Sequence, residues 1–201
     1  MAQLLASFCG AHCLHSNQIP MKLFASTLTC LALALCFYAF VPGATTATTD
    51  KGQLEWLSWE EAMQRQEQAP RKILVDVYTD WCGWCKRMDA NTFEDPKIAA
   101  YLNEHFYVVK LDAEQKETIK WRGNDFVYRP DAGRRGIHTL AYSLLEGRMS
   151  YPSIVYLDDV VNRISISPGY KTPEQIMPEL TYVVEEGYKS MTLDEFKKRT
   201  K

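Results

Sequence analysis

Two cysteines, Cys82 and Cys85, are the residues whose type and spacing point most directly to chemistry. They stand at the start of a helical pattern, where residues i and i+3 face the same way, so their sulfurs can come within disulfide reach. The unpaired N–H groups and the dipole of a helix N-terminus favour an anion. A thiolate there is stabilised, and the pKa of the thiol falls below its free value of about 8.5. The pattern predicts a site that makes and breaks disulfides.

The two cysteines are expected to play different parts. Cys82 lies at the helix end, which we expect to be exposed, and Cys85 lies one turn further in, where we expect it to be buried. Stabilisation of a thiolate by the helix terminus falls off within the first turn. We therefore expect Cys82 to attack a client disulfide and Cys85 to resolve the mixed disulfide that forms.

The segment that must position the pair is an apolar run with one carboxylate in it. Residues 73–77 are β-branched or apolar except for Asp76, and the run has the length of a strand. A turn at Asp80-Trp81 joins this strand to the cysteines. Periodicity leaves two interpretations of Asp76 open: a buried carboxylate, or a strand-end carboxylate that faces solvent.

The remaining cysteines and histidines argue against other uses of the pair. All the other cysteines precede residue 47: Cys9, Cys13, Cys30 and Cys36. A secreted disulfide scaffold uses several dispersed pairs. A structural zinc site needs four ligands, and the later chain adds only His105 and His138, neither at ligand spacing. Haem attachment requires a histidine after the second cysteine, where Lys86 stands. Redox chemistry remains, with no metal and no cofactor expected.

The segment from Ile73 to Lys86 resembles the active-site segment of thioredoxin. Ile73-Leu74-Val75-Asp76, followed by Trp81-Cys82-Gly83-x-Cys85-Lys86, has the spacing of that family. The resemblance implies that Asp76 is the buried acid that assists proton transfer to Cys85. It also implies that Lys110 is the strand lysine that lies near this acid. Trp84 departs from thioredoxin, which has proline there, and because the dipeptide between the cysteines tunes the redox potential in this family, the direction of the reaction stays open.

The flanking elements predict an α/β protein with the thioredoxin-like fold, a central mixed sheet flanked by helices. A helix capped by Ser58, the strand with Asp76, the cysteine helix, a helix over 96–106 and a strand over 107–112 follow in order. Strands in the order β-α-β imply parallel pairing with a right-handed crossover. The cysteines then lie at the carboxyl end of a central strand, where open α/β sheets place their sites.

Residues 113–149 form an insertion relative to thioredoxin, between the second core strand and the expected cis-proline. Two short runs flank Gly123-Asn124, a two-residue hairpin signal. A Gly/Arg-rich loop over 130–136 and a helix over 137–145 follow. The aromatic residues of the hairpin either contact a client protein or pack within a small subdomain.

Tyr151 and Pro152 stand directly before the next strand. The resemblance implies a cis-proline at this place, whereas position alone also allows a trans proline at a strand start. We expect Trp81, Gly83 and Trp84, together with Tyr151 and Pro152, to form a rim that receives an extended peptide. The whole thioredoxin-like domain is expected to span residues 57–190, and a short basic tail over 191–201 to form a frayed or peripheral helix.

Residues 1–47 have the pattern of a targeting leader. Lys22 is the single charged side chain of residues 1–49, and it is followed by an apolar run and then by small residues. We expect translation to start at Met21. The apolar run approaches the roughly 20 residues that span a bilayer, so an uncleaved membrane anchor stays open beside a signal peptide. A linker over 48–56 follows, and the leader predicts a bacterial periplasmic protein or one anchored in the membrane and facing the periplasm.

The expected partners follow from the redox pair and the leader. They are disulfide-containing client proteins and a membrane or periplasmic thiol electron donor, with membrane contact only if the leader is uncleaved. The net charge of −2 gives no indication of nucleic-acid binding. The finer resemblance is to exported bacterial thioredoxin-like proteins with a Cys-Gly-Trp-Cys centre, acting as reductase or isomerase. A thioredoxin-fold adaptor, or a module that binds a soft metal such as Cu(I) through two thiolates, stays open as an alternative.

A reporter fusion checks the predicted leader. We expect a reporter that is active only outside the bacterial cytoplasm to be exported when it is fused after residue 60, because the segment after Lys22 has the pattern of an export signal. Reporter activity in intact cells measures this. The same fusion lacking residues 1–47 is the control and should stay inactive. Retention of the full fusion in the cytoplasm would contradict the prediction.

Overall fold

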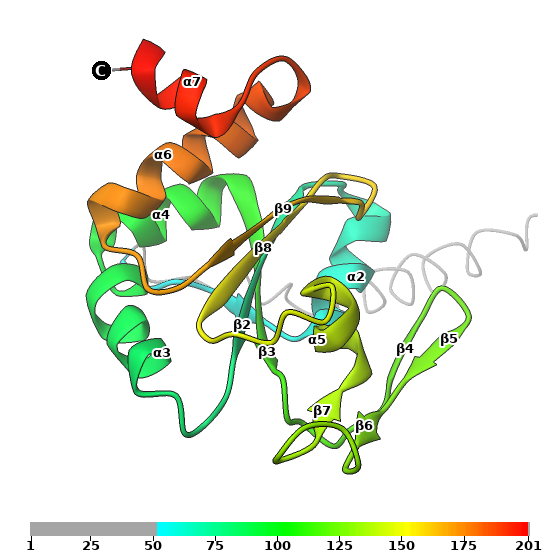
Figure 1. Ribbon diagram of the computed structural model, residues 1–201. Helices are drawn as coiled ribbons and strands as arrows, with labels where there is room; N and C mark the ends of the chain where they lie inside the picture. Colours follow the sequence, from blue (N-terminus) through cyan, green and yellow to red (C-terminus); the bar gives the residue numbers. More distant parts are fainter. Residues whose placement is uncertain (1–51, 201) are drawn as a thin grey trace, which may run out of the picture. The chain divides into compact units, whose positions relative to one another are not determined.

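The computed structural model of this protein describes residues 52–200. The apolar run before the cysteines forms β2 (Lys72–Tyr78), the middle strand of a five-stranded sheet with the order β1-β3-β2-β8-β9 (Figure 1). The other strands are β1 (Trp56–Leu57), β3 (Phe106–Asp112), β8 (Ser153–Leu157) and β9 (Arg163–Pro168). β1, β3 and β2 are parallel, whereas β8 pairs antiparallel with both β2 and β9. The predicted mixed sheet is confirmed.

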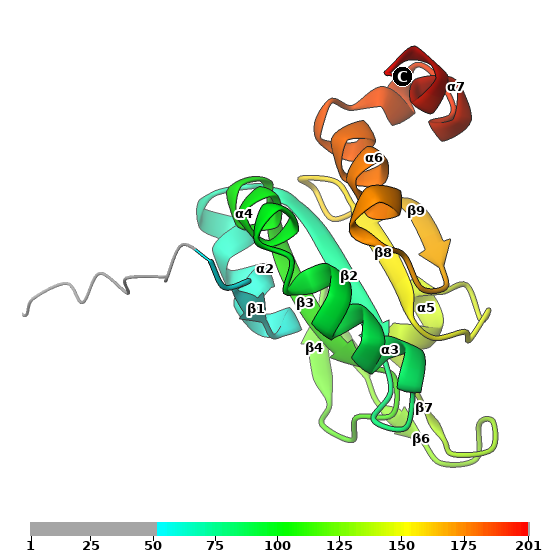
Figure 2. The same cartoon turned by 90° about the vertical axis from the view of Figure 1, so that its left-hand side faces the viewer.

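Helices cover both faces of this sheet. One face carries α2 (Trp59–Gln68) and α5 (Thr139–Leu144), and the other carries α4 (Pro96–His105) and α6 (Pro173–Val184) (Figure 1). Figure 2 looks from the side of α4 and α6, with α3 (Gly83–Met88) in front of the sheet. Ser58 caps α2 as predicted, and it forms a capping box with Glu61. The α/β class predicted from the sequence is therefore the observed one.

Alternation along β2 decides which layer each side chain meets. Ile73, Val75 and Val77 are fully buried in the cluster that includes α2 and α5. Leu74 is fully buried in the other cluster, together with Met88 of α3 and residues of α4 and α6. Successive side chains of a strand point to opposite faces. Asp76 therefore shares the face of Leu74, on the side of the sheet where α3 lies.

The insertion forms two small antiparallel pairs of strands before α5. They are β4 (Ile119–Trp121) with β5 (Asn124–Phe126), and β6 (Tyr128–Arg129) with β7 (Ile137–His138). The predicted helix over 137–145 is wrong at its start, because Ile137 and His138 pair with β6 and the His138 side chain caps α5 instead. α5 begins only at Thr139.

The β4–β5 hairpin differs from the sequence-based prediction by one residue. Its two-residue turn is Arg122-Gly123, and Asn124 already pairs with Trp121. Both turn residues have positive φ, 48° and 73°, as a type I′ hairpin turn requires. The Trp121 ring lies 5.2 Å from the ring of Trp59 on α2 and packs against the core. Of the two interpretations of the hairpin aromatics, packing is the observed one.

The end of the chain forms a short helix that packs on α6. Thr192 caps α7 (Leu193–Arg199), and a turn of 3₁₀ helix, η3 (Gly187–Lys189), precedes it. Phe196 is 6% exposed, and its ring lies 5.4 Å from that of Tyr182 on α6. The predicted leader and residues 48–51 of the predicted linker lie outside the described residues. Within residues 52–200, no helix is both long and apolar enough to cross a membrane.

Candidate active site

The two cysteines lie at the point where β2 turns into α3. Cys82 is the N-cap residue of α3, with an extended backbone, and its Sγ accepts a hydrogen bond of 3.1 Å from the Cys85 backbone N–H. The two sulfurs form a disulfide, with the Cα atoms 5.3 Å apart. A tight turn precedes the helix, in which the Cys82 N–H donates a hydrogen bond of 3.1 Å to the Thr79 carbonyl. α3 continues into a π-helical turn, η2 (Asp89–Phe93).

The expected difference in exposure between the cysteines is small in this oxidised form. Cys82 is 5% exposed and Cys85 is 2% exposed, so the expectation of an exposed Cys82 is wrong here. The reason is that Cys82 Sγ turns back over the first turn of α3, where it is bonded to Cys85 Sγ and accepts an N–H. What distinguishes Cys82 is therefore its cap position on the helix dipole.

Of the two interpretations of Asp76, a buried carboxylate is the observed one. Its side chain is 1% exposed and accepts an ion-paired hydrogen bond from Lys110 Nζ at 2.7 Å on Oδ2. The pairing follows from register, because Asp76 and Lys110 are direct partners in the parallel β2–β3 ladder. Oδ1 is buried without a hydrogen-bond partner among the described residues. Burial raises the pKa of Asp76 to about 6, although the Lys110 ammonium opposes this shift.

Lys110 also contacts a second carboxylate, Asp89, which the sequence analysis missed. Asp89 lies in η2, and Lys110 forms an ion pair with it as well as with Asp76. Burial alone would lower the pKa of Lys110, but the two carboxylates outweigh burial and raise it. The negative charge of Asp89 also adds to the raised pKa of Asp76. The available signal was spacing, because Asp89 lies four residues after Cys85 on the same helical face.

Three aromatic rings lie close to the Lys110 ammonium, whose side chain stays 22% exposed. Its Nζ lies 4.5 Å from the ring centroid of Trp56, 4.8 Å from Tyr78 and 5.8 Å from Phe93. Such cation–π contacts stabilise a cation that has left water. One partly buried cation is thus shared between two carboxylates, and the group as a whole carries an excess negative charge. A proton on Asp76 removes that excess.

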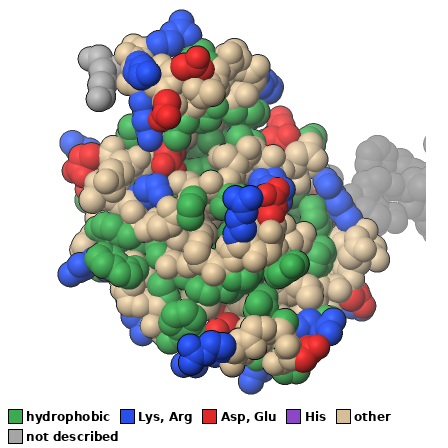
Figure 3. Space-filling view, viewed as in Figure 1, with side chains coloured by type: hydrophobic (Ala, Val, Ile, Leu, Met, Phe, Trp, Pro, Cys, Tyr) green, Lys and Arg blue, Asp and Glu red, His purple; other side chains and the backbone are tan. Residues whose placement is uncertain are grey.

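Exposed aromatic side chains surround the disulfide. Trp81 and Trp84 are 52% and 56% exposed, and hydrophobic side chains are visible over α3 in Figure 3. The rings of Trp81 and Tyr151 meet edge to face with centroids 5.9 Å apart. Burial raises the pKa of Tyr151 to about 12, so this phenol is neutral at physiological pH. The structure therefore brings these two predicted rim residues together.

The other predicted rim residues have separate surroundings. The Tyr151–Pro152 peptide bond is cis, and Pro152 itself is buried beside β8. Gly83 is exposed, and a side chain there would meet no atom within 4 Å. Trp84 lies 5.5 Å from the ring of Tyr170, a neighbour from the β9–α6 connection that the sequence analysis did not identify. No local pattern could show it, since the two rings are far apart in the chain.

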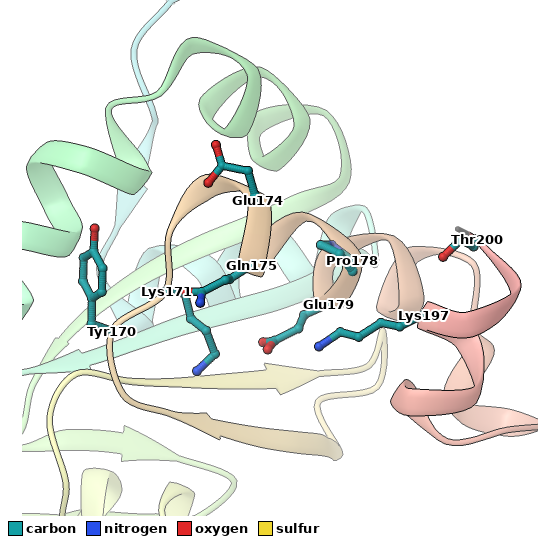
Figure 4. A pocket seen from close by; sticks show the side chains of 8 residues that line it. All are labelled: Tyr170, Lys171, Glu174, Gln175, Pro178, Glu179, Lys197 and Thr200. Atoms are coloured by element: carbon teal, nitrogen blue, oxygen red, sulfur yellow. The ribbon is translucent and has the colours of Figure 1, made fainter.

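Two cavities lie near these residues. One, of about 430 Å³, is lined by Trp81, Glu114, Met149, Tyr151 and residues 133–137 of the insertion. A larger cavity of about 610 Å³ lies between α6 and α7, with Tyr170 at one end and Lys197 and Thr200 at the other (Figure 4). It contains neither cysteine. Among the described residues, no group of three or more His, Cys, Asp and Glu side chains is arranged to hold a metal ion.

Comparisons with known proteins agree with this geometry. Residues 46–127 match a family model described as Thioredox_DsbH, protein of unknown function, DUF255. A solved thioredoxin from Thermus thermophilus superposes with a TM-score of 0.50 at 17% identity, covering 67% of this chain and 90% of that one. The chain has the thioredoxin-like fold predicted from the sequence, and these likenesses support the predicted thioredoxin-like superfamily.

Curated relatives point to thiol–disulfide chemistry. The thiol:disulfide interchange protein DsbD of Vibrio vulnificus is 30% identical over 84 residues, which is 40% of this chain and 14% of DsbD. The disulfide bond reductase DsbH of Chlamydia pneumoniae is 30% identical over 64 residues, 31% of this chain and 39% of DsbH. The chain also spans 9% and 10% of two animal relatives. It is therefore similar to thiol–disulfide oxidoreductases over part of their length.

The buried Asp76 carboxylate should make stability depend on pH. Its pKa is about 6 in the folded protein and about 3.9 in an unfolded chain. Its neutral form therefore favours folding below pH 4, and this contribution is lost as the pH rises through 6. We expect Asp76→Asn to be more stable than the wild type at pH 7.5, by about 2–3 kcal/mol, with the difference shrinking towards pH 4. Urea unfolding across this pH range measures it.

The matched control is Asp125→Asn, an exposed carboxylate on the β4–β5 hairpin. It should leave the pH dependence of stability unchanged. If Asp76→Asn also leaves the pH dependence unchanged, the raised pKa of Asp76 is contradicted.

Proposed function

We propose that this protein is an exported thiol–disulfide oxidoreductase that reduces or isomerises protein disulfides through Cys82 and Cys85. The observation that carries the proposal is a disulfide at the N-terminus of α3, with the buried Asp76–Lys110 pair on the same side of the sheet. The DsbH relative is named a disulfide bond reductase, which supports the reductive direction. Export rests on the leader pattern of residues 1–47.

The reaction transfers two electrons from the dithiol to the client. The Cys82 thiolate attacks one sulfur of a client disulfide, which forms a mixed disulfide and releases the first client thiolate. Cys85 then attacks Cys82 Sγ, so the mixed disulfide breaks, the second client thiolate leaves and the Cys82–Cys85 disulfide forms. A thiol electron donor reduces this disulfide again. Run in reverse, the same steps oxidise a client dithiol.

Separate parts of the site favour the separate steps of this reaction. Cys82 Sγ accepts a backbone N–H at the helix N-terminus, which stabilises its thiolate in the reduced protein. Asp76, with a pKa of about 6, is mostly ionised at neutral pH and is basic enough to take the proton from Cys85 as it attacks. Trp81, Trp84 and Tyr151, with Pro152 behind them, provide the surface on which an extended client segment lies.

Cysteine variants separate the two proposed roles. With Cys85→Ser the mixed disulfide has no resolving thiol, so clients should accumulate as reducible adducts on Cys82. Cys82→Ser should form few or none, because the Cys85 thiol is not stabilised by the cap position of the helix. Non-reducing gels and mass spectrometry of trapped adducts measure both. Equal trapping by the two variants would refute the assigned roles, and trapping by neither would favour an adaptor with a structural disulfide.

Asp76→Asn should slow the resolution step and leave mixed-disulfide formation intact. Loss of a positioned general base lowers a rate by on the order of 100-fold. We expect the resolution step of Asp76→Asn to be slower than that of the wild type between pH 6 and 8. The two rates should converge at higher pH, where Cys85 loses its proton without help. Rapid-quench measurement of the decay of the mixed disulfide tests this, with Asp125→Asn as the control. Parallel pH–rate profiles for wild type and Asp76→Asn would contradict the role of Asp76.

A further inference from the structure

The insertion places a short basic loop beside the candidate active site. The β6–β7 loop, residues 130–136, carries Arg134 and Arg135, and both are exposed. Figures 1 and 2 show β6 and β7 at the same end of the molecule as the connection from β2 to α3. The cavity of about 430 Å³ joins the two features, because Trp81 and Tyr151 form one part of its lining and residues 133–137 form another. Trp81 directly precedes Cys82 in the chain.

Specific contacts hold the loop in this position. The Tyr128 hydroxyl donates a hydrogen bond of 2.5 Å to the Arg135 carbonyl. Gly136 has φ +80°, and a Cβ there would fall 2.1 Å from the Tyr128 oxygen, so the backbone passes directly over this ring. The guanidinium carbon of Arg135 lies 5.6 Å from the centroid of the Trp81 ring. The basic loop and the aromatic rim are thus in contact.

The charges of the loop are not neutralised within the described part of the chain. Between residues 52 and 200, no carboxylate oxygen lies within 4.0 Å of a guanidinium nitrogen of Arg134 or Arg135. The neighbouring Asp131 is paired with Arg129. Glu114 is the acidic residue of the cavity lining, and its Oε1 accepts a 2.9 Å hydrogen bond from Trp81 Nε1. Among the residues that line the cavity, two cations therefore stand against one carboxylate, and Asp112 adds a further negative charge near Tyr151.

We propose that Arg134 and Arg135 bind an acidic side chain of the client protein that lies within a few residues of its disulfide cysteine. A guanidinium is a planar donor that matches a carboxylate, and an exposed guanidinium retains water that a carboxylate replaces easily. The client cysteine must reach Cys82. Trp81 directly precedes Cys82 in the chain and lines the cavity that also contains the two arginines. The insertion thereby selects among the clients of the proposed function, on which this inference rests.

Peptide disulfides of matched sequence test the selection. Three peptides carry Glu, Gln or Lys on either side of one disulfide-bonded cysteine, and hydroxyethyl disulfide serves as an uncharged reference for turnover. We expect wild-type kcat/KM to favour the Glu peptide over the Lys peptide by roughly 10-fold, the range that two exposed ion pairs supply. This preference should weaken at high salt, which screens exposed charges.

The variant Arg134→Gln/Arg135→Gln should lose the preference, with each peptide rate normalised to the variant's own hydroxyethyl disulfide rate. A charge-matched control is Lys120→Gln/Lys198→Gln, two exposed cations away from the cavity, which should keep it. Full preference in the double arginine variant, or no preference in the wild type, overturns this inference alone. Failure of the wild type to reduce hydroxyethyl disulfide or any of the peptides instead overturns the proposed function.

Discussion

The contact between Asp76 and Lys110 is the interaction around which the site is arranged. A carboxylate that is 1% exposed in the middle strand of a sheet is unfavourable unless a cation accompanies it. The parallel register of β2 and β3 supplies that cation directly opposite. Three aromatic rings and Asp89 then close around the ammonium. Burial raises the pKa of Asp76 to about 6 although the ammonium opposes it, and the charge of Asp89 adds to the rise, so Asp76 can exchange a proton near neutral pH.

The same arrangement separates the proposed acid–base chemistry from the proposed client contact. Asp76 and Lys110 lie within the sheet and its covering layer, whereas Trp81 and Trp84 project from the turn into α3 and are half exposed. The cysteine pair lies between these two regions in the chain, on the first turn of α3. Under the proposed function, changes to the outer aromatic and basic residues should therefore alter which clients approach without changing the protonation of the buried groups.

The insertion has a double role in this architecture. Its first hairpin packs Trp121 against Trp59 of α2 and so extends the core on one face of the sheet. Its second pair of strands holds the β6–β7 loop beside Trp81, at the edge of the redox pair. β2 and α3 supply the buried acid and the cysteine pair. Residues 113–149, predicted from the sequence to be an insertion relative to thioredoxin, supply further surface next to them.

Local sequence determined the features that depend on neighbours in the chain. The apolar run 73–77 specified a buried strand, Ser58 with Glu61 specified a helix start, and the spacing of Cys82 and Cys85 specified a disulfide-capable helix end. The resemblance to thioredoxin also indicated Asp76 and Lys110, which no local pattern pairs. The turn of the β4–β5 hairpin lies one residue earlier than the sequence predicted. Trp121 pairs with Asn124, which leaves Arg122 and Gly123 as the turn residues with positive φ.

Tertiary structure alone decided the rest. The register of two strands brings Asp76 to Lys110, as the resemblance implied. No pattern in the sequence indicated that Asp89 reaches the same cation from η2 or that Trp84 meets Tyr170 of the β9–α6 connection. The burial of Cys82 likewise depends on how its sulfur turns back over α3. Composition and periodicity describe which face a side chain occupies, but they do not describe which distant side chain faces it. That pairing sets the local dielectric and the neighbouring charge, and these two quantities determine whether a carboxylate or a thiol can act at neutral pH.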